Sequence, residues 1–213
     1  MTGSATRPDV RVLPMGERAL LVELADGAAA EALHAELLRR RAAGDLVVRE
    51  IVPAARTVLL DGLDDPGRLA ARLPSWDVPP LPPRTEDVLE LPVRYDGPDL
   101  ADVADAWGVP VREVPRIHAA AEFRVAFCGF APGFGYLTGL QRLPDVPRRA
   151  TPRTTVPAGS VALAGPYTGV YPRPSPGGWQ LIGTTDAVLW DHTREPAALL
   201  SPGVRVRFVP EAR

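Results

Sequence analysis

Three segments between residues 130 and 179 concentrate glycine, proline, aromatic and hydroxyl residues: Phe130–Leu140, Pro152–Val161 and Tyr171–Trp179. Glycine permits a positive φ and close approach of the backbone, whereas proline fixes φ and removes a hydrogen-bond donor. Alternating the two residue types predicts rigid, irregular loops that an ordinary core does not need. These segments therefore indicate a binding or catalytic site.

Hydroxyl groups in these segments could orient a polar ligand, and Ser160, Thr168, Tyr171 and Ser175 are the candidates. For each of them a role in a turn is at least as good an interpretation. Ser160 lacks the second glycine of a nucleophile elbow, so the sequence gives a serine hydrolase little support.

Four arginines lie between the first two segments or at their edge, namely Arg142, Arg148, Arg149 and Arg153. The planar guanidinium matches a carboxylate or a phosphate. We assign a functional role to Arg153, which stands in a proline-flanked run, and interpret the other three as surface residues.

Histidine and cysteine are too sparse for a metal site. No pair among His34, His118 and His192 has ligand spacing, and the single cysteine, Cys128, fits a small buried hydrophobe. His118 precedes the first glycine-rich segment, so a polar role at the site competes with a structural role.

Composition excludes several functions. All 24 basic residues are arginine, so no lysine can serve a P-loop, form a Schiff base with pyridoxal phosphate or carry biotin. The net charge of −2 does not favour nucleic acid or an anionic membrane, and no apolar run approaches the length of a membrane span. Without a signal peptide pattern, we expect a cytoplasmic protein.

The first 83 residues predict a small α+β domain. Apolar patterning indicates strands at residues 10–13, 19–24, 47–52 and 57–60, and helices at 28–42 and 66–73. Residues 74–84 contain five prolines and predict a semi-rigid linker.

Residues 84–213 predict a second, mainly β domain. A strand at 88–93 and helices at 99–108 and 111–121 come first, and no helix is expected after residue 125. Short apolar runs separated by glycine and proline indicate a compact antiparallel barrel or sandwich, with strands at 125–127, 161–164, 169–171, 179–182, 187–190 and 204–209.

The motifs in these segments resemble, in order and spacing, the family of bacterial 5-oxoprolinase B subunits. The family is also called KipI or allophanate hydrolase subunit 1 and carries a carboxyltransferase domain of subdomains C and D. The resemblance rests on Phe130–Leu140, Pro152–Val161, Thr168–Pro172, Ser175–Trp179 and Leu181–Gly183, and it is strong over residues 88–210. One departure is Thr184, where the family pattern leads us to expect arginine.

The resemblance implies an α+β fold in which a small α+β N-terminal domain precedes a cyclophilin-like antiparallel β-barrel. It implies a protein that acts with C-type and A-type subunits to convert 5-oxo-L-proline to L-glutamate with ATP. Because the chain has no P-loop lysine and no obvious acid/base pair, we expect it to complete a shared site and to be inactive alone. No metal, biotin or pyridoxal phosphate on this chain is expected.

On this basis we expect backbone N–H groups of the glycine-rich loops and the Arg153 guanidinium to meet a substrate carboxylate or a phosphorylated intermediate. Tyr136, Tyr171 and Trp179 would wall the pocket. Arg153, His118 and Ser160 are the catalytic candidates. The expected substrate-binding residues are Phe130, Pro132, Gly133, Phe134, Tyr136, Arg153, Gly159, Ser160, Thr168, Gly169, Tyr171, Ser175, Gly177, Gly178 and Trp179.

Other functions remain open from the sequence. The KipI-type members suggest an inhibitor that binds a sensor histidine kinase, and a related enzyme interpretation is a component of an allophanate hydrolase or urea amidolyase. A peptidyl-prolyl isomerase follows only from the implied fold and ranks last.

Overall fold

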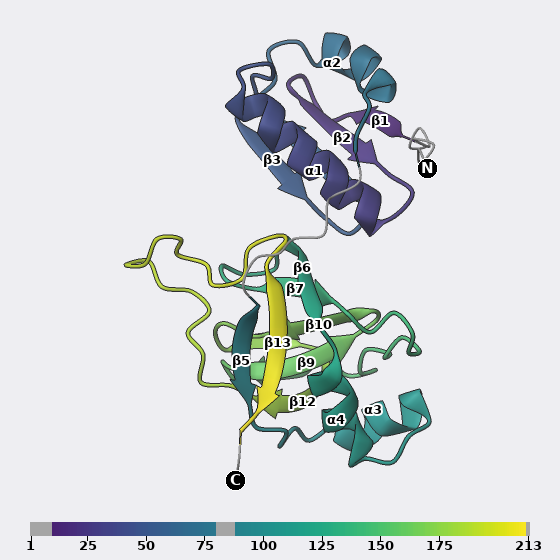
Figure 1. Ribbon diagram of the computed structural model, residues 1–213, viewed down its shortest axis with the longest axis vertical. Helices are drawn as coiled ribbons and strands as arrows, with labels where there is room; N and C mark the ends of the chain where they lie inside the picture. Colours follow the sequence, from purple (N-terminus) through teal and green to yellow (C-terminus); the bar gives the residue numbers. More distant parts are fainter. Residues whose placement is uncertain (1–9, 80–87, 212–213) are drawn as a thin grey trace. The chain divides into compact units, whose positions relative to one another are not determined.

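The computed structural model describes residues 10–79 and 88–211, and the chain divides into two compact units, Met1–Thr85 and Glu86–Arg213 (Figure 1). The expected domain boundary between residues 83 and 84 lies outside the described residues. Each unit has a hydrophobic core of its own.

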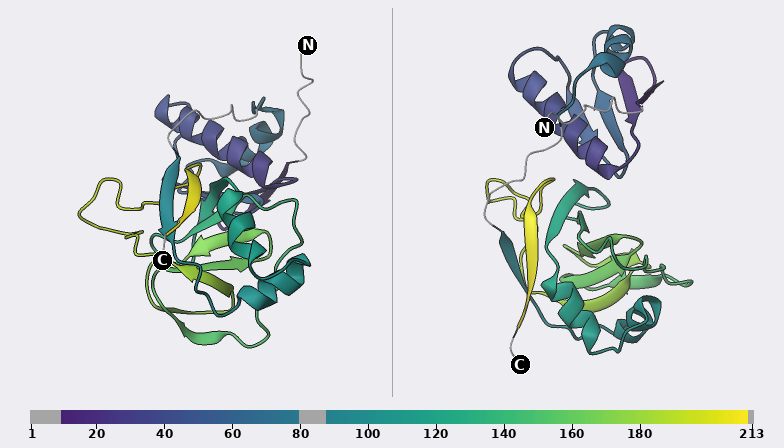
Figure 2. Two further views of the ribbon diagram at one scale, coloured as in Figure 1. Left: turned by 60° about the horizontal axis from the view of Figure 1, so that its bottom comes forward. Right: turned by 45° about the vertical axis from the view of Figure 1, so that its right-hand side comes forward.

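The first unit is a four-stranded antiparallel sheet with the order β1-β2-β4-β3. Helix α1 lies along one face of this sheet (Figure 2). The elements are β1 Arg11–Pro14, β2 Ala19–Glu23, α1 Gly27–Ala42, β3 Glu50–Pro53, β4 Thr57–Asp61, α2 Pro66–Arg72 and the 3-10 turn η1 Leu73–Ser75. The strands and helices expected here from apolar patterning are thus confirmed, although β3 begins three residues later than predicted.

The linker prediction is wrong for its first residues. Leu73–Ser75 form a 3-10 turn, and Trp76 and Val78 pack against the core of the first unit. The guanidinium of Arg40 on α1 stands 3.8 Å above the Trp76 ring. This packing buries apolar surface that the proline-rich composition alone did not indicate, so these residues belong to the first unit. Residues 80–84 of the predicted linker lie outside the described residues.

The second unit is built on a seven-stranded sheet with the order β12-β9-β10-β7-β6-β13-β5 (Figure 1). Its elements are β5 Leu89–Val93, α3 Leu100–Trp107, α4 Glu113–Ala120, β6 Phe123–Cys128, β7 Gly135–Thr138, β9 Ser160–Ala164, β10 Tyr167–Val170, β12 Gln180–Thr184 and β13 Arg205–Pro210. A separate two-stranded antiparallel sheet pairs β8 Arg153–Val156 with β11 Ser175–Gly177.

Backbone hydrogen bonds join the two ends of this sheet and close it into a barrel. Arg94, just after β5, exchanges both backbone bonds with Thr184 of β12 at 2.9 and 2.8 Å, and Gly97 donates to Ile182 at 3.2 Å. A Cβ on Gly97 would come within 2.3 Å of the Ile182 backbone. The closure therefore depends on a residue without a side chain at this point.

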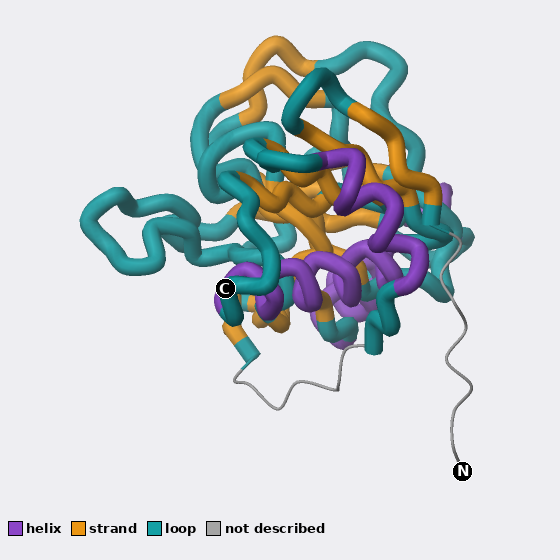
Figure 3. The backbone as a smooth tube through the Cα atoms, turned by 90° about the horizontal axis from the view of Figure 1, so that it is seen from above, coloured by secondary structure: helices purple, strands orange, loops and turns teal. Residues whose placement is uncertain are grey.

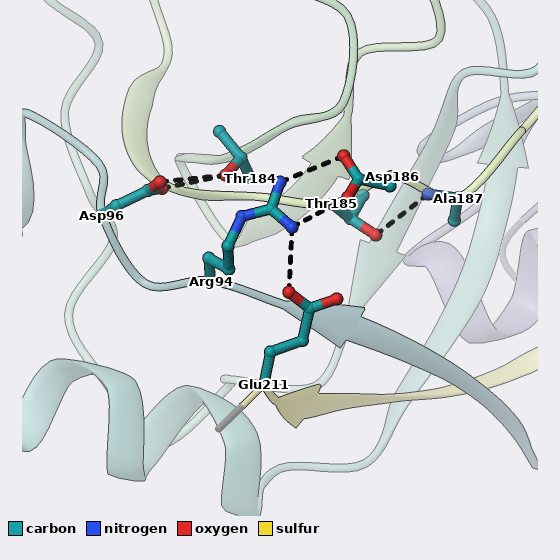
Figure 4. A network of polar contacts seen from close by, with 7 residues as sticks. All are labelled: Arg94, Asp96, Thr184, Thr185, Asp186, Ala187 and Glu211. Atoms are coloured by element: carbon teal, nitrogen blue, oxygen red, sulfur yellow. Dashed lines mark hydrogen bonds and ion pairs between the residues drawn. The ribbon is translucent and has the colours of Figure 1, made fainter. Parts of the chain in front are cut away.

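Charged side chains reinforce the closure (Figure 4). Arg94 donates to Asp186 at 2.8 and 3.0 Å and to Glu211 at 2.9 Å, and the Thr184 hydroxyl donates to Asp96. The arginine hydrogen bonds lower the pKa of Asp186. Thr184, the departure from the family pattern, thus takes part in closing the barrel.

The predicted fold class is confirmed, with three corrections to its strands. β5 and β13 pair in parallel, so the sheet is mixed. β7, β8 and β11 lie in segments that we expected to be irregular loops, and residues 187–190 form no strand beyond a bridge between Trp190 and Ala198. These last residues belong to a long connection that extends away from the barrel (Figures 1 and 3).

The interior of the barrel holds one hydrophobic cluster. Helices α3 and α4 contribute Val103, Trp107 and Val114, and the strands contribute residues such as Phe123 and Phe208. Gly108 ends α3 in the left-handed conformation with φ 66°, which glycine adopts without steric cost. In the described part of the chain, no helix combines the length and the hydropathy needed to cross a bilayer.

Candidate functional site

Strand β9 is buried on both of its faces, because a second layer of side chains covers the outside of the barrel. Val161 and Leu163 point to the interior, and Ala162 and Ala164 pack on the outside against aromatic rings. We call these rings the aromatic cluster; they are Phe127, Phe130, Phe134, Tyr136, Tyr167, Tyr171 and Trp179. The glycine-rich segments thus meet on one outer face of the barrel.

Phe134 is the centre of the aromatic cluster. Its ring is almost fully buried and makes edge-to-face contacts with Phe130, Tyr136, Tyr171 and Trp179, at centroid distances from 5.1 to 5.5 Å. Edge-to-face pairs are favourable beyond their buried area and fix ring orientations. The cluster is therefore a packed, rigid layer.

Two of the predicted binding glycines make room for these rings. A Cβ on Gly169 would lie 2.7 Å from the Phe134 ring, and one on Gly177 would lie 2.3 Å from the Tyr171 hydroxyl oxygen. Such distances are far below van der Waals contact. Glycine at these positions has a packing reason that is independent of any ligand.

Phe130 stands at the rim of the cluster in an unusual backbone conformation. Among the described residues, it is the one non-glycine residue with a positive φ, 67°, and its side chain is 56% exposed. The neighbouring Gly133, at φ 84°, packs against the backbone of Leu189 and the Cβ of Trp190, which is also exposed. Backbone strain that presents an aromatic ring to solvent is typical of a functional surface.

The tyrosines of the cluster carry protons at neutral pH. Burial raises the pKa values of Tyr136, Tyr167 and Tyr171, and nearby Arg148 opposes this increase at Tyr136 and Tyr171. A protonated phenol donates a hydrogen bond but does not accept a proton as a base. These residues can orient or polarise a ligand.

His118 is not part of this surface. Its ring is fully buried in the barrel interior, where Nδ1 contacts the Tyr95 hydroxyl at 2.8 Å and Nε2 contacts the Thr168 hydroxyl at 3.3 Å. It packs against Phe123 and Phe208. Thr168, predicted to bind substrate, instead faces the interior as a partner of His118. The structural interpretation of this histidine is the one that its contacts support.

Acid should destabilise the second unit through His118. Burial of the neutral ring lowers the pKa of His118 from 6.5 to about 3, so the unfolded chain binds a proton first as the pH falls. The stabilising contribution is complete above pH 6.5 and is lost towards pH 3, at about 1.4 kcal/mol per pH unit. In urea unfolding, the free energy of unfolding of the second unit should therefore be about 2 kcal/mol lower at pH 5 than at pH 7. His118→Gln should abolish this difference. His192→Gln, at an exposed position, is the control, and an equal effect of both variants would contradict the assignment.

Ser160 is buried at the start of β9, and its carbonyl accepts a hydrogen bond from the Tyr171 backbone. Both ring nitrogens of His118 are engaged elsewhere, so this histidine does not activate the Ser160 hydroxyl. Within residues 10–79 and 88–211, no side chain pairs with the Ser160 hydroxyl in the way that a base pairs with a nucleophile. Ser175 donates to the Arg173 carbonyl at 3.2 Å, which agrees with its interpretation as a turn residue.

Arg153 forms an ion pair that the sequence did not reveal. It donates through Nη2 to Oδ1 of Asp99 at 2.7 Å, and Arg149 donates through Nη1 to the same oxygen at 2.9 Å. Interpreting Arg149 as a surface residue was therefore wrong, because its side chain is only 33% exposed and its charge is paired. The structure leaves Arg142 and Arg148 exposed, as expected.

Asp99 is expected from the sequence to begin a helix, and α3 does begin after it. Its side chain nevertheless makes no capping hydrogen bond and instead binds the two arginines. The sequence offered only one signal for this ion pair, an acidic residue next to the start of a helix. Such a residue ordinarily indicates an N-cap and not an ion pair.

The described residues contain no group of three His, Cys, Asp or Glu side chains that could hold a metal ion. Cys128 is partly buried beside the interior core, and burial raises its pKa to about 11. Its thiol is therefore protonated at neutral pH.

Comparison with known proteins identifies the fold and the family. Residues 10–200 match the family described as "Carboxyltransferase domain, subdomain C and D". The 5-oxoprolinase B subunit of Escherichia coli O157:H7 is 52% identical over 126 residues, which cover 58% of this chain and 58% of that protein. The match thus spans less than two thirds of this relative.

Two solved structures share the architecture. The crystal structure of TTHA0988 matches 92% of this chain and 40% of its own chain, with 36% identity and a TM-score of 0.72. The Kluyveromyces lactis urea carboxylase matches 96% of this chain and 22% of its own, with a TM-score of 0.73, and at 21% identity this likeness shows the fold alone. From the family match over residues 10–200, together with the motifs around the aromatic cluster, the chain belongs to the carboxyltransferase subdomain C and D family.

Proposed function

We propose that this chain is the B subunit of an ATP-dependent 5-oxoprolinase, which converts 5-oxo-L-proline to L-glutamate at a site shared with a partner polypeptide. The observation that carries the proposal is the 52% identity to the 5-oxoprolinase B subunit of Escherichia coli O157:H7. The match covers little more than half of each chain, so activity, substrate and partners are proposals.

The second unit supports a shared site because its candidate groups bind rather than transfer protons. The cluster tyrosines are protonated, no described residue pairs with Ser160 as a base, and His118 is enclosed. More than half of TTHA0988 lies outside its match to this chain. We propose that C-type and A-type subunits supply the missing groups and that this chain is inactive alone.

For the proposed reaction, this chain needs to supply hydrogen-bond donors and does not need to supply a base. Phosphorylation of the lactam carbonyl oxygen by ATP would activate the ring carbon; water then adds there and the C–N bond breaks, leaving an amine and an acyl phosphate. A second water releases phosphate. Negative charge develops on oxygen at each addition, and fixed N–H and O–H donors stabilise such charge.

The aromatic cluster is the surface that we propose for the substrate. Phe130 at its rim and the partly buried Tyr136 would cover the apolar ring atoms of 5-oxoproline and exclude water, and the protonated phenols would donate hydrogen bonds. Arg153, whose charge also acts on Tyr171, lies beside the cluster and would meet the carboxylate or the phosphorylated oxygen.

Reconstitution with the neighbouring subunits tests the proposal, with ATP-dependent release of glutamate as the readout. We expect turnover of 5-oxo-L-proline in the three-subunit mixture and none with this chain alone. Allophanate as the substrate distinguishes the related enzyme function, and suppression of histidine kinase autophosphorylation by the chain alone distinguishes the inhibitor.

Arg153→Ala is expected to lower the turnover of the reconstituted complex by about 10- to 100-fold, because a charge-assisted hydrogen bond to an oxyanion contributes about 1.5–3 kcal/mol. Arg142→Ala removes an exposed arginine from the same stretch and should leave turnover unchanged. Undiminished turnover in Arg153→Ala would remove this arginine from the mechanism.

A further inference from the structure

A single buried carboxylate holds two arginines beside the aromatic cluster. The Asp99 side chain is 3% exposed, and its Oδ1 accepts from Arg149 Nη1 and from Arg153 Nη2. Sharing one oxygen places the two guanidinium groups next to each other. They come from different segments, since Arg153 begins β8 and Arg149 precedes it in a loop.

Asp99 is itself fixed in position by β12. Its Oδ2 accepts from the Leu181 backbone N at 2.6 Å, and its own backbone N donates to the Leu181 carbonyl at 3.0 Å. The Arg149 backbone is fixed by a hydrogen bond from its N to the Gly178 carbonyl at 2.8 Å. The two guanidinium groups are thus held before any ligand arrives, which lowers the entropic cost of binding one.

Donors remain after this pairing. Arg149 Nε and Arg153 Nη1 are both buried, and no described residue accepts a hydrogen bond from either atom. Buried polar groups in native proteins are ordinarily paired, so these atoms indicate a missing partner.

Charge favours an anion as that partner. Arg149 and Arg153 carry two positive charges against the one charge of Asp99, while Asp102, 4.0 Å from Arg149, is 58% exposed and therefore screened. Arg148 adds a further positive charge, and its Nε would lie 3.7 Å from a Cβ on Gly178. The side chains of Arg149 and Arg153 are 33% and 22% exposed, so each is open to solvent in part, although Arg149 Nε and Arg153 Nη1 themselves are covered.

We propose that Arg149 and Arg153, positioned by Asp99, form a binding site for a small oxyanion, either a carboxylate or a phosphoryl group. The anion accepts from Arg149 Nε and Arg153 Nη1 once a movement of the arginine side chains uncovers these two atoms. A planar fork suits both chemistries, because guanidinium groups bind carboxylate and phosphate in the same way. The identification of the anion with the carboxylate of 5-oxoproline or with transferred phosphate rests on the proposed function; the site itself does not.

Isothermal titration of the full chain alone tests the site, with inorganic phosphate and 5-oxo-L-proline as separate probes at constant ionic strength. We expect one or both to bind. Binding of 5-oxo-L-proline alone assigns the carboxylate, and binding of phosphate alone assigns the phosphoryl group. Arg149→Ala and Arg153→Ala should each weaken binding at least about tenfold, and the double variant should be little weaker than either single one, because both donors serve one anion.

Arg142→Ala is the matched control, since it removes the same charge from an exposed position nearby. If Arg142→Ala weakens binding of the probes as much as the site variants do, general charge attraction governs binding, and the proposed site is wrong. Absence of binding by either probe would also overturn it, because water would then suffice for the buried donors. The Arg149 Nε–H resonance of the unaltered chain should shift on titration, and this measurement stands even where a variant fails to fold.

Turnover separates this inference from the proposed function. A reconstituted complex that hydrolyses 5-oxo-L-proline, with a chain that binds neither probe, refutes the site and leaves the proposed function standing. If the chain binds an anion through Arg149 and Arg153 but the reconstituted complex is inactive, the site stands and the proposed function is refuted.

Discussion

Asp99→Ala is expected to lower the free energy of unfolding of the second unit by about 3 kcal/mol. Removing one partner of a buried ion pair costs about 3–5 kcal/mol, because the remaining charge stays unpaired in a poorly solvated place. We expect the lower end of this range, since Arg149 and Arg153 reach solvent in part and can be hydrated. The variant also leaves the Leu181 N–H without its acceptor.

Hydrogen exchange of the full chain in increasing urea measures this loss separately for residues 88–211 and for residues 10–79. The first unit should be unchanged. Asp102→Ala, at an exposed carboxylate 4.0 Å from Arg149, is the matched control and should cost less than about 1 kcal/mol. Similar losses in both variants would show that Asp99 contributes no more than a surface ion pair.

Phe134→Ala is expected to lower the free energy of unfolding of the second unit by about 3–5 kcal/mol. The ring is 2% exposed and contacts four other aromatic rings, so its removal leaves a cavity and loses their edge-to-face contacts. Gly169, which has no Cβ because Phe134 occupies that space, cannot fill the cavity.

Phe130→Ala serves as the control, because Phe130 also touches Phe134 but is 56% exposed. It should cost less than about 1 kcal/mol, since little apolar surface is buried there. It should nevertheless weaken partner or substrate binding in the reconstituted complex if the rim of the cluster is the functional surface. A loss of stability as large as that of Phe134→Ala would mean that Phe130 is mainly a structural residue.

Most helices and strands of both units could be predicted from the sequence, because apolar patterning and capping residues act over a few residues. The apolar stripe at residues 28–42 predicted helix α1, and in the structure Asp26 is its N-cap and accepts from the Ala29 backbone at 2.8 Å. Gly108 and Asp65 likewise mark helix ends by their intrinsic preferences. These signals lie within a few residues of the feature that they predict, so no tertiary information is required.

Strand assignment failed where it depended on a partner. Residues 187–190 have an apolar run, but both ends of the barrel sheet are already joined through Arg94 and Thr184, so no barrel edge is open to them. β11 contains Pro176 and, among the described strands, pairs only with β8, so its other edge is free and tolerates a proline. Pairing is a property of the folded chain.

The composition of the candidate site was predicted in part. We expected Tyr136, Tyr171 and Trp179 to wall one pocket, and in the structure their rings pack around Phe134. Only the tertiary structure decided that Thr168 faces the interior, since strand register sets which of two alternate residues points inward.

The ion pairs show most clearly what the tertiary structure alone decided. Arg148 and Arg149 are adjacent and identical in type, yet one is exposed and the other shares Asp99 with Arg153. Asp99 lies 50 residues before Arg149, and its position depends on the hydrogen bonds that α3 and β12 make when the barrel closes. Residue type determined that these groups could bind an anion, and closure of the barrel decided which of them are held in place to do so.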